Sequence, residues 1–76
     1  MELKVSERIC VLAWQEPGGT LVSRGKKLHL REDALLMAEE LDREYPELHH
    51  WAAPATEAEL TLHAAQLARL MAEEAR

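Results

Sequence analysis

A chain of 76 residues has room for one hydrophobic core and not for two. Its only cysteine, Cys10, has no partner for an intramolecular disulfide, which indicates a reducing compartment. The stretch from Met1 to Glu7 lacks the basic start and apolar run of a secretory leader, and no later stretch approaches the roughly 20 apolar residues of a membrane span. We therefore expect a single cytoplasmic domain, residues 1–76, with no membrane contact.

The net charge of -5 is divided unevenly along the chain. Residues 1–31 hold six bases against three acids, a balance of +3, whereas residues 32–76 hold eleven acids against three bases, a balance of -8. The acidic excess argues against a surface that binds nucleic acid over its whole extent.

The first half of the chain has the pattern of β-strands. Residues 8–14 alternate bulky and β-branched side chains, which predicts a strand covered on both faces. Proline and glycine in residues 16–20 predict a hairpin turn. A second strand is expected to begin at residues 20–23, with a further turn or bulge at 23–26 before alternation resumes over 27–30.

The period then changes from two to 3.6, which predicts a helix from Glu32 to about Glu44. Acids in its first turn interact favourably with the helix dipole, and Pro46 ends the helix. The expected buried stripe is Ala34, Met37, Ala38, Leu41 and Tyr45.

Residues 47–53 are too few for a stable helix, so they are interpreted as a short third strand closed by Pro54. Thr56 and Glu59 have the spacing of a capping box, which predicts the start of a second helix that runs to about Glu73 or Glu74 and frays afterwards. Its expected buried stripe is Leu60, Ala64, Leu67 and Met71. The predicted fold is α+β: a small β-hairpin or three-stranded sheet covered by two α-helices, in the order β-β-α-short β-α.

No pattern for catalysis or a cofactor is present. Cys10 lies in an apolar strand without the neighbouring cation that lowers a thiol pKa, so we expect a packed side chain and no enzyme. The histidines lack the spacing of an anchored zinc site, and a histidine-based metal-binding protein is only a second alternative. The histidines are His29, His49, His50 and His63.

The acids around the end of the first helix give the most specific functional indication. They predict a surface that attracts a basic protein. A protein that normally holds nucleic acid is one such partner, because carboxylates can take the place of phosphates. An exposed Trp51 would be an anchor, and Leu36 and Leu62, on the polar sides of their helices, could form one apolar patch covered by a second copy in a homodimer. The acids are Glu39, Glu40, Asp42, Glu44 and Glu47.

The alternative function is a regulator that binds nucleic acid through a basic hairpin. Its cations cluster around one turn, but the acidic remainder repels nucleic acid and few aromatic residues are available for stacking. The cations are Arg24, Lys26, Lys27 and Arg31.

In size, acidity and lack of a catalytic motif, the chain resembles the small inhibitor and regulator proteins of phages and other mobile elements, anti-CRISPR proteins among them. No single motif carries this resemblance, so it assigns no residue a role. It implies a non-catalytic, protein-binding inhibitor or regulator, which agrees with the acidic surface.

Overall fold

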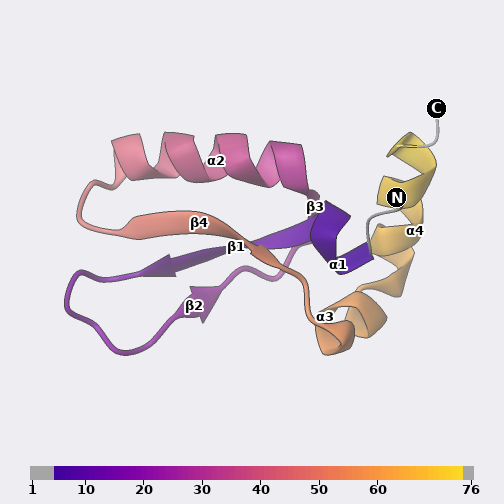
Figure 1. Cartoon of the computed structure of the whole chain (residues 1–76), viewed down its shortest axis with the longest axis horizontal. Helices are drawn as coiled ribbons and strands as arrows, with labels where there is room; N and C mark the ends of the chain where they lie inside the picture. Colours follow the sequence, from indigo (N-terminus) through magenta and orange to yellow (C-terminus); the bar gives the residue numbers. More distant parts are fainter. Residues whose placement is uncertain (1–4, 75–76) are drawn as a thin grey trace.

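The computed structural model describes residues 5–74, with side chains from Glu7 onward. Residues 1–4, which belong to the stretch without a leader pattern, and residues 75–76, where fraying is expected, lie outside the described residues. The elements are α1 (Val5–Arg8), β1 (Ile9–Gln15), β2 (Ser23–Arg24), β3 (His29–Leu30), α2 (Arg31–Glu44), β4 (His49–Pro54), α3 (Glu57–Leu62) and α4 (Ala64–Glu74). The chain forms an antiparallel sheet, with α2 along one side of it and α1, α3 and α4 gathered at one end (Figure 1).

The long strand β1 is the centre of the sheet. It pairs with β4 over six residue pairs, from Cys10 opposite Pro54 to Gln15 opposite His49. Both β2 and β3 pair with β1 as well, at Ala13 and at Ile9 respectively. Because a strand has only two edges, β2 and β3 share the edge opposite β4 as one interrupted strand. The predicted α+β fold is thus confirmed, and residues 25–28 divide the expected second strand into β2 and β3.

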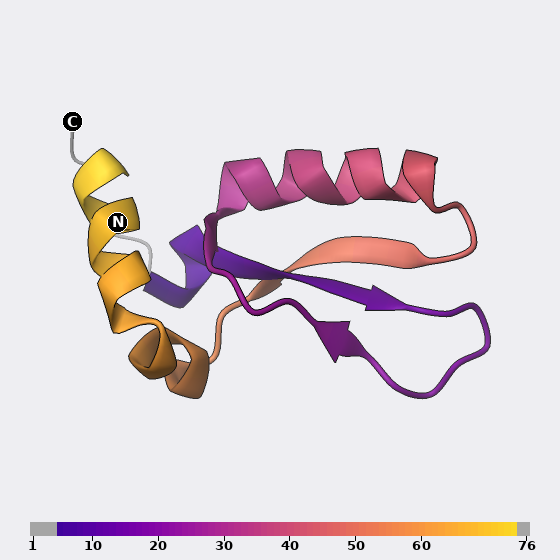
Figure 2. The same cartoon turned by 180° about the vertical axis from the view of Figure 1, so that it is seen from behind.

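The predicted covering of β1 on both faces is confirmed. Ile9, Cys10, Val11 and Ala13 are all buried, although consecutive residues of a strand point to opposite faces. One face packs against α2, while the core on the other face includes side chains of α3 and α4. In the two opposite views, α2 runs along the sheet and α3 and α4 lie at one end of it (Figures 1 and 2). The core beside α3 and α4 comprises Ile9, Val11, Ala13, Leu28, Ala53 and Ala55, with half-buried Leu30, Trp51, Leu60, Leu67, Leu70 and Met71 packed against it.

Helix α2 begins and ends close to the predicted positions, and its C-terminal residue is followed by Tyr45 and Pro46 as expected. Ala34 and Ala38 are buried, but Met37 and Tyr45 are exposed, so the predicted stripe was too wide. The small alanines let the helix approach the sheet closely, and the sheet is too narrow to cover bulkier residues at the margins of the stripe.

The predicted second helix is wrong in one respect, because the chain turns at His63 and forms two helices. The capping box at its start is confirmed: Thr56 Oγ1 accepts from the Glu59 N–H, and Glu59 Oε1 accepts from the Thr56 N–H. The turn at His63 allows α4 to pack Leu67 and its neighbours against the core, and it leaves Ala64 exposed. No glycine or proline marks this position, so tertiary packing decides it.

The predicted turn after β1 is present but longer than expected. The Gly19 N–H donates to the Glu16 carbonyl at 2.9 Å, and Gly18 has a φ of 77°, which glycine adopts without strain. Residues 20–22 are not paired, so β2 begins only at Ser23. This loop carries Leu21 and Val22 into solvent.

Candidate functional site

The outer side of α2 presents a leucine surrounded by carboxylates. Leu36 is 65% exposed. Side chains three and four residues away are its neighbours on the helix surface, and all four of these positions hold acids. Each of them is exposed. The Leu36 surface, as we name it, consists of Leu36 with Glu32, Asp33, Glu39 and Glu40.

Further carboxylates lie at the last residue of α2 and in the loop that follows it. Glu44 and Glu47 are exposed and form no ion pair with a described residue. Arg43 lies among them and contacts Glu39 Oε1 at 3.0 Å, but both side chains are well exposed. An exposed pair of this kind holds its partners weakly, so Glu39 stays available to a second cation.

Asp42, which was predicted to join the acidic surface, instead binds the sheet. Its Oδ1 accepts from the backbone N–H of His50 at 2.7 Å and lies 2.8 Å from His50 Nδ1. Hydrogen bonds from the His50 side chain and backbone hold the pKa of Asp42 below its usual value. The reason is geometric: α2 passes over the edge strand β4, and Asp42 satisfies a strand N–H that has no neighbouring strand.

Two other acids of the C-terminal part are paired with arginines of the N-terminal part. Arg24 forms a bidentate pair with Glu59, with Nη2 to Oε1 at 2.7 Å and Nε to Oε2 at 2.9 Å. These bonds lower the pKa of Glu59 to about 2. Arg8 donates from Nε to Glu74 Oε1 at 3.1 Å. Glu59 and Glu74 are therefore already bound within the fold, whereas the acids of the Leu36 surface take no part in these two pairs.

The predicted apolar anchors do not lie together. Leu62 is 78% exposed on α3, which lies at one end of the sheet, whereas Leu36 lies on α2, which runs along the sheet (Figures 1 and 2). The two leucines do not form one patch, because their helices lie on different parts of the sheet. Trp51 is half-buried against the core and stacks on His49, with ring centroids 5.3 Å apart. Its packing uses much of the area that an interface anchor would need.

The cations predicted to act together are also separated. Arg24 is held by Glu59 and by the Pro54 carbonyl, to which its Nη2 donates at 3.0 Å. Arg31 begins α2 and lines a different hollow. Lys26 and Lys27 are exposed between β2 and β3, where α4 packs beside them. The Lys26 hollow, as we name it, is lined by Lys26, Lys27, Leu62, His63, Ala65, Gln66 and Arg69.

Arg69 was missed by the sequence reasoning because it lies some forty residues from the lysines. Gln66, one turn earlier on α4, positions Arg69 near the two lysines. The Gln66 side chain accepts from the Leu28 N–H and donates to the Leu28 carbonyl, both at 2.9 Å. A glutamine three residues before an arginine gives no sequence signal for this contact, so only the tertiary structure reveals it.

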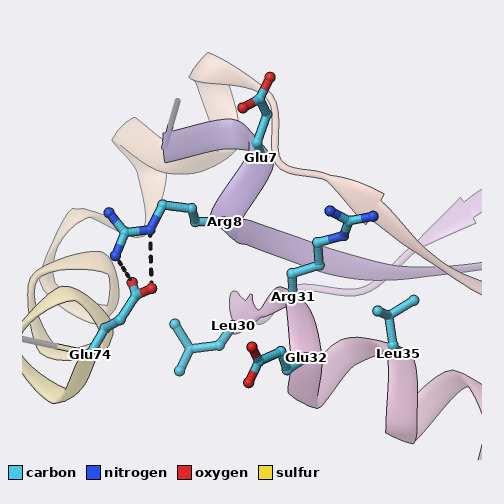
Figure 3. Close-up of a pocket in the computed structure, with 7 residues that line it drawn as sticks. All are labelled: Glu7, Arg8, Leu30, Arg31, Glu32, Leu35 and Glu74. Carbon is cyan, nitrogen blue, oxygen red and sulfur yellow. Dashed lines mark hydrogen bonds and ion pairs between the residues drawn. The ribbon is translucent and has the colours of Figure 1, made fainter. Parts of the chain in front are cut away.

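Another hollow lies where α1, α4 and the start of α2 meet (Figure 3). Leu30 and Leu35 provide apolar contact, and the Arg8 to Glu74 ion pair closes one side. Its lining contains two arginines and three glutamates, so neither sign of charge dominates. The lining residues are Glu7, Arg8, Leu30, Arg31, Glu32, Leu35 and Glu74.

The cysteine and three of the histidines considered for chemistry are buried or half-buried. Cys10 is buried, and burial raises the pKa of its thiol. His50 is buried on Asp42, and half-burial lowers the pKa of His29. Among residues 5–74, no group of three or more histidine, cysteine or acidic side chains could hold a metal ion.

Comparison with protein families, with curated proteins and with solved structures found no match. Within the described part of the chain, none of the helices combines the length and apolar character needed to cross a membrane.

Proposed function

We propose that this chain is a non-catalytic protein-binding module whose Leu36 surface engages a basic partner protein. The observation that carries the proposal is the exposure of Leu36 within a ring of four carboxylates. Protein interfaces usually combine a central apolar side chain, which docks in a pocket, with a charged rim, which orients the two proteins. The partner would offer an apolar pocket bordered by lysine or arginine.

Charge and packing contribute to binding in different ways. The carboxylates of Glu32, Asp33, Glu39 and Glu40 raise the rate of encounter with a cationic surface and fix its orientation. Burial of Leu36 then lengthens the life of the complex, because a fully buried leucine is worth about 1.5–3 kcal/mol. Binding should weaken as salt screens the carboxylates.

If the partner's basic surface is one that holds nucleic acid, the carboxylates occupy the positions of phosphates and the module competes with the nucleic acid. This is the action expected of an inhibitor of the phage or anti-CRISPR type. It requires that the captured partner lose nucleic-acid affinity when the module is added, which a competition measurement tests.

The test compares two charge reversals that change the net charge equally. The immobilised protein is used to capture partners from a lysate of its source, beside Glu39→Lys with Glu40→Lys and Glu57→Lys with Glu73→Lys. Glu57 and Glu73 are exposed and form no ion pair with a described residue, so they are matched controls. We expect the first variant to lose the partner and the second to retain it. Equal loss in both variants would contradict the proposal.

A further inference from the structure

Within residues 5–74, most of the cations that form no ion pair with a described residue lie in one place. Residues 5–74 contain seven lysines and arginines, of which Arg8, Arg24 and Arg43 form ion pairs. The other four form none with a described residue, although the chain holds 14 acids for 9 bases. Three of these four, Lys26, Lys27 and Arg69, line the Lys26 hollow, whose lining contains no carboxylate.

The fold holds these cations in place before any ligand arrives. Gln66 bonds both backbone groups of Leu28, which directly follows Lys27 and is only 1% exposed. Arg69 follows Gln66 by three residues on the same helix and therefore lies close to the same face. Because this contact joins α4 to the segment that carries the lysines, the main cost of binding is the ordering of the side-chain ends.

We propose that the Lys26 hollow binds the phosphodiester backbone of single-stranded nucleic acid, independently of the Leu36 surface. The hollow is open and about half polar, unlike the enclosed apolar pockets that hold small ligands, and an open cationic groove suits a polymer. Leu62, 78% exposed, and the half-buried His63 at its border provide surface for a base or sugar. A duplex, with its greater charge density, is repelled more strongly by the acidic remainder of the protein.

The test is fluorescence anisotropy of the full chain with a labelled oligodeoxythymidine of about 12 nucleotides, a length within the usual site sizes of single-strand binders. Three phosphate contacts predict a slope of about -2 for log K against log salt, so affinity should fall about 100-fold over a tenfold rise in salt. Lys26→Glu with Lys27→Glu, and separately Arg69→Glu, should weaken binding at least about tenfold.

The control is Arg31→Glu with Arg43→Glu, which changes the net charge as much as the double lysine variant does. It should leave affinity within about threefold of the original value, because neither residue lines the hollow. Glutamine at positions 26 and 27 provides a milder variant, and circular dichroism confirms that each variant folds.

Three results would overturn the proposal. One is the absence of binding at about 20 mM salt, where phosphate contacts are strongest. Another is equal loss of affinity in the control variant, which would show a general effect of net charge. The last is displacement of the oligonucleotide by poly-glutamate or by duplex DNA as readily as by unlabelled single strand. None of these results bears on Glu39 or Glu40, so failure here is distinguishable from failure of the proposed function.

Discussion

Replacing Glu59 with glutamine should lower stability by an amount that depends on pH. Glutamine preserves the capping-box bond, because its side-chain oxygen can accept from the Thr56 N–H as that of glutamate does. It removes the negative charge that Arg24 binds through two hydrogen bonds. The substitution therefore isolates the ion pair that joins β2 to α3.

The magnitude follows from the pKa of Glu59 and from its exposure. A fall from 4.5 to about 2 corresponds to at most about 3 kcal/mol of stabilisation, at about 1.36 kcal/mol per pKa unit. The side chains of Arg24 and Glu59 are 35% and 20% exposed, so solvent screens part of this. We expect Glu59→Gln to lower the free energy of unfolding by about 1–2 kcal/mol near neutral pH. For a domain of this size, that is a fall in Tm of about 5–15 °C.

The sign of the pH dependence is fixed by the direction of the pKa change. Because folding lowers the pKa of Glu59, its contribution is fully present above pH 4.5 and is lost as the pH falls towards about 2. Urea unfolding followed by circular dichroism should show the gap between the original protein and the variant closing over this range. Glu57→Gln is the control, since Glu57 is exposed in the same first turn. A gap that is constant with pH, or equal in both variants, would refute the reasoning.

Leu28→Ala should destabilise the fold by about 2–5 kcal/mol in urea unfolding, because Leu28 is fully buried, and a loss under about 1 kcal/mol would be inconsistent with its place in the core. Gln66→Ala should cost about 1–3 kcal/mol by leaving the Leu28 backbone groups without partners, and hydrogen exchange at the Leu28 amide should accelerate; unchanged exchange would argue against the contact. Asp42→Asn should destabilise the protein at neutral pH and progressively less as the pH falls below 3.8, because the His50 contacts lower the pKa of Asp42 in the fold; a deficit that persists unchanged in acid would contradict this assignment.

Local patterns in the sequence predicted the elements of the fold well. Alternation identified β1, the 3.6 period identified α2, and the capping box of Thr56 and Glu59 placed the start of α3. These signals arise within a few residues, so they do not depend on tertiary contacts. The break at His63 was not predictable in this way, because it is produced by the packing of α4 against a core assembled from other elements.

The same distinction applies to the candidate surfaces. Leu36 and its four acidic neighbours share one helix, so helical geometry alone places them together. Arg24 and Asp42 were assigned to surfaces by their neighbours in sequence, yet each is bound by a partner on another element, Glu59 on α3 and His50 on β4. Counting charges along the sequence therefore overestimates the number of charged side chains that remain free to bind a partner.

The most direct test of the proposed function places a photoreactive amino acid at position 36 and, in a second protein, at position 62. Both side chains are exposed, at 65% and 78%, so both probes would reach any molecule that docks beside them. After irradiation in a lysate, the account predicts a basic protein cross-linked at position 36 and not at position 62. A protein cross-linked equally at both positions, or at position 62 alone, would contradict it.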